Sequence, residues 1–215
     1  MFKKKPFFVV FEGVEGCGKS FQAQKLYKNL KKNKVDTILT REPGGTKSSE
    51  LIRNLILKDY FTKDSKEKFD KYTDTLLYLA ARNEHIKNKI KPALLKKKVV
   101  ICDRFIDSTI AYQVYGKKID KKFINNIHKK ILRGIKPNIV FVLKVSKKTS
   151  RIRLKKRKTK NRYDNFKQSF YTNAQKSFIK IAKNKKNYFV LDSSSNDNSL
   201  QIKIFNIIKR YLNIK

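Results

Sequence analysis

The clearest chemical signal in the sequence is a glycine-rich stretch at residues 13–20. It reads G-V-E-G-C-G-K-S, which is the G-x-x-x-x-G-K-S pattern of phosphate-binding loops. Glycines let successive backbone N–H groups point into one concavity that suits anionic oxygens. Lys19 can reach the β- and γ-phosphates of a nucleoside triphosphate, and the Ser20 hydroxyl can bind Mg²⁺. The residues expected to bind the triphosphate are Gly13, Val14, Glu15, Gly16, Cys17, Gly18, Lys19 and Ser20.

Charged residues follow or end several apolar runs of the chain. In a parallel sheet, the carboxyl ends of the strands share one edge, and ligands bind beyond that edge. The sequence therefore predicts a charged site where these ends meet. Its members are Glu12, Arg41, Asp103, Arg104 and Asp192.

Two of these residues suit ligands of opposite charge. The Arg41 guanidinium can hold a phosphate in a bidentate fork, and the alternative is a surface ion pair with Glu42. The Asp103 carboxylate can hold Mg²⁺, directly or through water, close to Ser20. For Asp103 and Arg104 together, the alternative is a structural salt bridge.

The elements that must position these residues alternate along the chain. Short runs rich in aromatic and β-branched residues predict strands at residues 7–11, 35–40, 98–103, 138–143 and 187–192. Periodic or capped stretches predict helices at residues 21–30, 50–56 (capped by Thr46 or Ser48), 74–90, 108–115, 120–132, 148–156, 165–182 and 200–212.

This alternation predicts an α/β fold in which a five-stranded parallel sheet lies between two layers of helices. We expect the helix over residues 74–90 to end before Pro92. Residues 60–71 and 157–164 are expected to be loops. The whole chain, residues 1–215, is interpreted as one domain.

The composition is strongly basic, with 54 Lys and Arg against 17 Asp and Glu and a net charge of +37. A polyanionic partner is one explanation. We favour compositional drift, because the lysines are dispersed, although charge alone would still give a non-specific, salt-sensitive affinity for nucleic acid. Cys17 and Cys102 form neither a disulfide framework nor a metal cluster, which is typical of the reducing cytoplasm. No run reaches the roughly 20 apolar residues of a membrane span.

Three further motifs make the resemblance to a family specific. They are REPGGT at residues 41–46, LAAR at residues 79–82, and Asp103-Arg104-Phe105 followed by Ser108 and Ala111-Tyr112-Gln113. With the phosphate-binding loop, their order and spacing resemble thymidylate kinases across residues 7–212. The resemblance implies a P-loop NTPase-type fold with a short lid, and transfer of a phosphoryl group from ATP to dTMP during dTTP synthesis. It also implies Mg²⁺, a cytoplasmic location and a homodimer.

The resemblance implies roles in dTMP binding for a defined set of residues. Arg41 would hold the acceptor phosphate, and a cis Glu42–Pro43 bond would fix the turn that directs this arginine. Tyr78 would stack on thymine, at a position where the family commonly has Phe. Glu15 would bind the 3′-hydroxyl and Tyr112 would pack against the sugar. The full set is Glu15, Arg41, Pro43, Arg53, Tyr78, Arg82, Arg104, Ser108, Thr109, Tyr112 and Gln113. A core aromatic is the alternative for Tyr78, and a solvated helix arginine is the alternative for Arg53.

The catalytic cations implied by the resemblance are Lys19, Arg104 and arginines of a mobile lid. Gly16 occupies the position where some thymidylate kinases carry an arginine in the loop, so this chain resembles the bacterial type. That type supplies its arginines from the lid, here residues 151–164, and Arg157 and Arg162 are the candidates. The alternative is a solvated basic loop. Another nucleoside or nucleotide kinase, a nucleic-acid-binding P-loop ATPase and an inactive relative are the remaining functional alternatives.

Overall fold

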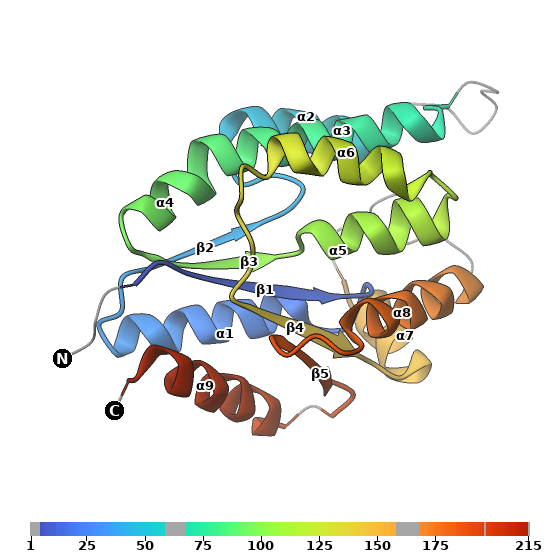
Figure 1. Ribbon diagram of the computed structural model, residues 1–215. Coiled ribbons are helices and arrows are strands. Elements are labelled where there is room, and N and C mark those ends of the chain that lie inside the picture. Colours follow the sequence, from blue (N-terminus) through green and yellow to red (C-terminus); the bar gives the residue numbers. More distant parts are fainter. Residues whose placement is uncertain (1–4, 59–67, 158–167, 196, 215) are drawn as a thin grey trace.

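A single parallel sheet organises the chain (Figure 1). The computed structural model describes residues 5–58, 68–157, 168–195 and 197–214. The strands are β1 (Phe7–Gly13), β2 (Thr37–Arg41), β3 (Val99–Asp103), β4 (Ile139–Lys144) and β5 (Tyr188–Asp192). They lie in the order β2-β3-β1-β4-β5, and each of the four pairings is parallel. The predicted fold class is therefore confirmed.

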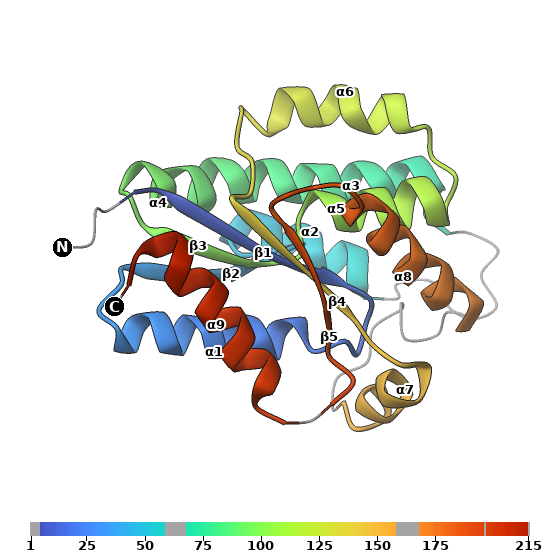
Figure 2. The ribbon, with the colours of Figure 1, turned by 60° about the horizontal axis from the view of Figure 1, so that its bottom comes forward.

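The central strands are apolar along almost their whole length because both faces of the sheet are covered. Helices α1 (Lys19–Lys32) and α9 (Ser199–Leu212) lie on one face, and α3 (Lys71–His85), α5 (Ile106–Thr109) and α8 (Gln168–Ala182) lie on the other (Figures 1 and 2). The largest fully buried side chains include Phe8, Phe11 and Phe141 from the central strands. This core fixes the edge at which the strands end.

The remaining helices frame that edge and the outer surface. Their bounds are α2 (Lys47–Leu57), α4 (Lys91–Leu95), α6 (Lys121–Ile131) and α7 (Lys147–Lys155). Thr46 caps α2, as one of the two predicted alternatives, by accepting a hydrogen bond from the Ser49 N–H. Figure 2 shows α6 as an additional outer layer, and it packs on α3.

The prediction that the helix after residue 74 ends before Pro92 is wrong. Helix α3 continues through a π-helical segment, η1 (Ile86–Ile90), directly into α4, which contains Pro92. Proline removes a backbone donor and its ring crowds the carbonyl four residues earlier. The wider π-helical turn before Pro92 relieves this crowding, so the chain can continue as a helix.

A second π-helical segment, η2 (Ile110–Gly116), follows α5 where the sequence predicted one regular helix at residues 108–115. Segments of this kind occur often at functional sites. The predicted loops at residues 60–71 and 157–164 lie largely outside the described residues. Among the helices that the structure describes, none has both the length and the apolar character required to cross a membrane.

Candidate active site

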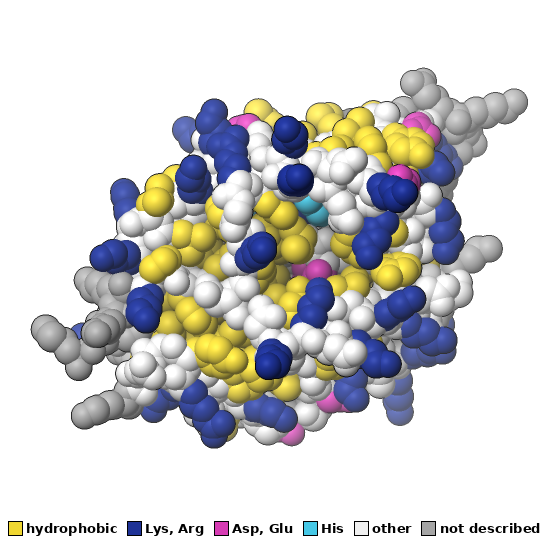
Figure 3. Space-filling view, in the orientation of Figure 1, with side chains coloured by type: hydrophobic (Ala, Val, Ile, Leu, Met, Phe, Trp, Pro, Cys, Tyr) yellow, Lys and Arg dark blue, Asp and Glu magenta, His cyan; other side chains and the backbone are white. Residues whose placement is uncertain are grey.

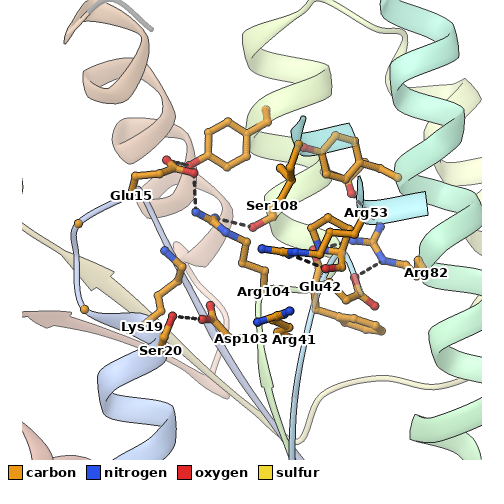
Figure 4. A pocket seen from close by; sticks show the side chains of 18 of the residues that line it. Glu15, Lys19, Ser20, Arg41, Glu42, Arg53, Arg82, Asp103, Arg104 and Ser108 are labelled. Atoms are coloured by element: carbon orange, nitrogen blue, oxygen red, sulfur yellow. Dashed lines mark hydrogen bonds and ion pairs between the residues drawn. The ribbon is translucent and has the colours of Figure 1, made fainter. Parts of the chain in front are cut away.

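A cavity of about 470 Å³ lies beyond the carboxyl ends of the strands (Figure 4). It brings together the phosphate-binding loop, the end of β2, α2, α3 and the segment after β3. The predicted residues that line it are Glu15, Gly16, Gly18, Lys19, Ser20, Arg41, Pro43, Arg53, Tyr78, Arg82, Asp103, Arg104, Ser108, Thr109, Tyr112, Gln113 and Arg157. Gly13, Val14 and Cys17 belong to the same loop but do not line the cavity, and Asp192 also lies outside it.

The phosphate-binding loop joins β1 to α1, as the sequence predicted. Gly16 and Gly18 have positive φ angles of 72° and 86°, which side-chain-bearing residues rarely adopt. A Cβ atom at Gly13 would lie 2.5 Å from the carbonyl oxygen of Leu143. The buried Lys19 Nζ donates to the Val14 carbonyl oxygen at 2.8 Å. The loop thus holds its lysine next to the concavity that its backbone forms.

Ser20 and Asp103 form a pair of oxygen ligands at one side of the cavity. The Ser20 hydroxyl donates to Oδ2 of Asp103, and Oδ1 of Asp103 is buried without a hydrogen-bond partner among the described residues. Mg²⁺ prefers hard oxygen ligands such as carboxylates and hydroxyls. The two residues therefore fit this cation, and the unpartnered Oδ1 is explained if the cation or its water shell binds there.

Arg104 lies in the middle of the cavity and is held from several directions. Its guanidinium pairs with Glu15 at 2.7 Å and donates to the carbonyl oxygen of Gly13 at 2.9 Å. The Tyr112 hydroxyl donates to the other Glu15 oxygen at 2.7 Å. Burial alone would raise the pKa of Glu15, but the charges of Arg104 and Lys19 keep that pKa below its ordinary value. Glu15 is therefore ionised. It contacts Arg104 and Tyr112, whereas the resemblance assigned it to the 3′-hydroxyl of dTMP.

Glu12 contributes more than its position at a strand end indicated. It is fully buried, and its Oε1 accepts hydrogen bonds from the backbone N–H groups of Phe105 and Ser108 at 2.8 and 3.2 Å. These bonds cap α5 from a distant strand, since Phe105 itself provides no side-chain cap. The Ser108 hydroxyl donates to Glu12 at 2.6 Å and accepts from Arg104 at 3.0 Å. Glu12 thereby fixes the segment that carries Arg104, whose φ angle is 72°.

The REPGGT motif carries a second buried carboxylate. Glu42 precedes a cis peptide bond to Pro43, as expected from the resemblance. It pairs with Arg82 at 2.7 Å and lies 3.1 Å from Nδ1 of His85. The alternative pairing of Glu42 with Arg41 is wrong, because Arg41 instead pairs with Glu50 at 3.2 Å. The Arg41 side chain remains 55% exposed and accessible to a ligand.

Gly45 allows this motif to pack closely on α3. A Cβ atom at Gly45 would lie 2.5 Å from Oγ1 of Thr40 and 2.6 Å from Nε2 of His85. His85 is fully buried, and its Nε2 lies 2.7 Å from the same Thr40 hydroxyl. The glycine therefore leaves the space that His85 needs to connect β2 to α3.

Comparisons with known proteins identify the family of this chain. The sequence profile of the thymidylate kinase family matches residues 11–204. This chain is a member of the thymidylate kinase family. A thymidylate kinase of Aster yellows witches'-broom phytoplasma is 40% identical over 209 residues, which cover 95% of this chain and 96% of that protein. One of Wolbachia pipientis is 40% identical over 178 residues, covering 81% and 84%. The crystal structure of thymidylate kinase from Ehrlichia chaffeensis has a TM-score of 0.74 at 31% identity, covering 95% of this chain and 99% of that one.

Tyr78, Arg53 and Gln113, which the resemblance assigned to the acceptor, all line the cavity. Tyr78 lines the cavity and is absent from the described hydrophobic core. Arg53 lines it too, and donates to the Pro43 carbonyl oxygen at 2.6 Å, so it is not a purely solvated arginine. Gln113 is buried, and its Nε2 has no hydrogen-bond partner among the described residues. An unpaired buried donor beside a cavity suits an acceptor oxygen of a ligand.

The lid region is described only in part. Arg162 lies outside the described residues, whereas Arg157 lines the cavity. Arg153 of α7 also lines it and donates to the Gly16 carbonyl oxygen at 3.4 Å, so it lies directly over the phosphate-binding loop. Arg153 falls within the predicted lid, residues 151–164, but only Arg157 and Arg162 were selected as catalytic candidates. Its position one helical turn before Arg157 was the signal that could have ranked it higher.

His128 of α6 is a site residue that the sequence analysis missed. It is buried, and its Nε2 lies 2.8 Å from Nη1 of Arg82. Burial, together with the charge of Arg82, lowers the pKa of His128 from 6.5 to about 3. His128 is therefore a neutral hydrogen-bond acceptor at any ordinary working pH.

This depressed pKa predicts a pH-dependent loss of stability. His128 contributes to the free energy of unfolding above pH 6.5, and this contribution is lost as the pH falls toward 3. The reason is that the unfolded chain then binds a proton on His128 that the folded chain does not bind. The free energy of unfolding should fall by about 2 kcal/mol more in the parent than in His128→Gln between about pH 6.5 and pH 5. Urea titrations of both proteins measure this difference. Equal pH slopes would contradict the assignment of a neutral buried histidine.

Proposed function

We propose that this chain is a thymidylate kinase that transfers the γ-phosphoryl group of ATP to the 5′-phosphate of dTMP, giving dTDP and ADP in the synthesis of dTTP. The observation that carries the proposal is the arrangement of one cavity in a chain of this family. The phosphate-binding loop with Lys19 and Ser20 lies on one side, and Arg41 and Arg53 lie on the other; Tyr78 also lines the cavity. Arg104 lies between the two groups (Figure 4).

This arrangement supports in-line transfer between two anionic nucleotides. The acceptor phosphate is already negatively charged and needs no strong base, so catalysis consists of positioning and of cationic stabilisation. Lys19 would bind the transferring phosphate, and Arg41 would hold the acceptor phosphate. Arg104 would bridge the two, because its guanidinium faces both the loop and the acceptor side.

The nucleoside of dTMP would occupy the side of the cavity formed by α3 and the segment after β3. Tyr78 offers an aromatic face for thymine. Ser108, Thr109 and the unpaired Gln113 amide would meet the edge of the base, and Tyr112 would pack against the sugar. Glu15, which Tyr112 and Arg104 already orient, would accept a hydrogen bond from the 3′-hydroxyl.

A lid over residues 151–164 would supply further cations. Arg153 and Arg157 already line the cavity, and Arg162 is the remaining candidate. Closing such a segment over bound ATP would exclude water and add positive charge near the transferring group. The γ-phosphoryl group would thereby be protected from attack by water during its transfer.

The proposal is tested by a panel of acceptors. With ATP and Mg²⁺, the purified chain should form ADP faster with dTMP than with thymidine or with other nucleoside monophosphates. Lys19→Ala is the matched control, and it should retain the fold but lose at least about 10²-fold in turnover. A preference for thymidine, or ATP hydrolysis that DNA or RNA stimulates without any acceptor, would overturn the proposal.

Mg²⁺ is proposed as the cation held by Ser20 and Asp103, where it would neutralise developing phosphate charge. Asp103→Asn keeps the size of the side chain but removes its charge. We expect this variant to need about 10–100-fold more Mg²⁺ for half-maximal activity. Asp192→Asn, at a strand end outside the cavity, is the control and should leave this requirement unchanged. A Mg²⁺ titration in which both variants match the parent would contradict the assignment.

A homodimer is proposed from two apolar pairs on neighbouring helices. Leu51 and Leu55 of α2 are 70% and 42% exposed, and Tyr72 and Leu76 of α3 are 42% and 47% exposed. Helices α2 and α3 pack against each other, so a second copy could bury both pairs. Sedimentation equilibrium should give twice the chain mass of 25.4 kDa. A single-chain mass at micromolar concentration would contradict the dimer.

The basic surface is proposed to have no dedicated partner. Figure 3 shows Lys and Arg side chains spread across the visible face, not gathered in one patch. Any affinity for nucleic acid is expected to be non-specific and to disappear in a binding titration as the salt concentration rises. We place the chain in the cytoplasm, where the buried thiols of Cys17 and Cys102 would remain reduced.

A further inference from the structure

Helix α6 contacts a residue of the cavity through the buried side chain of His128. None of the residues of α6 lines the cavity in the part of the chain that the structure describes. His128 nevertheless projects inward from this helix, and its Nε2 lies 2.8 Å from Nη1 of Arg82. The two residues are 46 positions apart in the chain. No sequence motif connects them.

The guanidinium of Arg82 is held on all of its nitrogens. Its Nε donates to Glu42 at 2.7 Å, and its Nη2 donates to the Phe105 carbonyl oxygen at 2.9 Å. Its Nη1 carries two N–H groups, which meet Oγ1 of Thr109 at 2.7 Å and Nε2 of His128 at 2.8 Å. Because the group is planar and rigid, these four contacts fix both its plane and its direction. These contacts use four of its five donors, so among the described residues one N–H on Nη2 has no partner, and Arg82 itself lines the cavity.

The His128 contact has a defined chemical form. Arg82 is a donor only, so Nε2 of His128 must present a lone pair, and the ring must be neutral. The low pKa of His128 satisfies this requirement. A protonated ring at this distance would instead repel the guanidinium and could accept no hydrogen bond.

A small apolar cluster packs α6 against the part of α3 that carries Arg82. Leu79 of α3, Ile119 and Ile124 are buried together, and Phe123 and Ile127 of α6 pack against them. Leu79 lies three residues before Arg82, so the cluster and the histidine connect α6 to the same turn of α3. The position of α6 is therefore coupled to the orientation of the arginine.

We propose that His128 is a positioning residue that orients the Arg82 guanidinium toward the acceptor nucleotide, so that α6 contributes to acceptor affinity without touching the ligand. This inference rests on the proposed function. Without the acceptor at Nε2, one N–H of a buried cation would lose its partner, and the guanidinium would turn to find another. The remaining donor on Nη2 would then point away from its place at the cavity.

The test compares three variants on the same helix. His128→Leu removes the acceptor, and His128→Gln places an amide oxygen near the position of Nε2. Ile127→Ala weakens the packing of α6 but leaves the histidine. Steady-state rates are measured with dTMP and with ATP as the varied substrate, and circular dichroism confirms that each variant is folded.

We expect His128→Leu to raise KM for dTMP about tenfold, which corresponds to the lower end of a hydrogen bond to a charged group. KM for ATP should change less than about twofold, because the phosphate-binding loop is unaffected. His128→Gln should restore most of the affinity. Ile127→Ala should change KM for dTMP by less than about twofold, because Leu79, Ile119 and Ile124 remain to hold α6 in place. If His128→Leu does not fold, His128→Asn replaces it, since its shorter side chain cannot reach Arg82.

Each contrary result has a distinct meaning. An active parent with an unchanged KM for dTMP in His128→Leu would overturn this inference alone. An equal rise in His128→Leu, His128→Gln and Ile127→Ala would also overturn it, because the effect would then come from the packing of α6. A parent that does not phosphorylate dTMP would overturn the proposed function and this inference with it.

Discussion

Ion pairs between arginines and glutamates organise the cavity. Arg104 pairs with Glu15, Arg82 pairs with Glu42, and Arg41 pairs with Glu50. Each pair connects different elements. The Arg104 pair connects the segment after β3 to the phosphate-binding loop, the Arg82 pair connects α3 to the segment after β2, and the Arg41 pair connects the end of β2 to α2. Cations that are fixed before binding can hold two nucleotides with charged phosphates close together. Mobile cations would lose conformational entropy on being ordered at each turnover, and this loss would raise the barrier. The carboxylates provide that fixation.

The pairs differ in burial, and this difference matches the roles proposed for them. The Arg82 and Glu42 side chains are only 3% and 4% exposed, so their pair must be fully hydrogen-bonded to be stable. Three further N–H groups of Arg82 donate to Thr109, His128 and the Phe105 carbonyl oxygen. Arg41 and Glu50 are 55% and 39% exposed, and such a pair costs little to break. Of these three arginines, Arg41 can thus most easily leave its glutamate and bind a phosphate instead.

Local sequence patterns were sufficient to predict the sheet and the loop. The apolar runs became β1 to β5, and the G-x-x-x-x-G-K-S pattern became a turn between β1 and α1 with Lys19 and Ser20 at its end. These features depend on neighbouring residues, which a sequence displays directly. The path through Pro92 was missed because it depends on a π-helical turn, and hydropathy does not distinguish that turn from a regular helix.

The partners of buried charges could not be predicted in the same way. A pair of Glu42 with its neighbour Arg41 was the one alternative that the sequence offered, whereas its partner in the structure is Arg82, 40 positions away. Glu12 reaches Ser108, 96 positions away, and so caps a helix that lacks a local cap. Such pairings follow from how strands and helices are stacked, and a single sequence does not specify that stacking. The site could be listed residue by residue, but the network that orients it required the fold.

A crystal structure of the chain with dTMP bound tests the central claim most directly. The account predicts the thymine ring against Tyr78 and the 5′-phosphate beside Arg41 and Arg104, on the side of the cavity that faces the phosphate-binding loop. The Arg82–Glu42 pair should remain intact, since it orients the site and does not need to open. A thymine ring far from Tyr78, or a phosphate directed away from Arg41, would contradict the account.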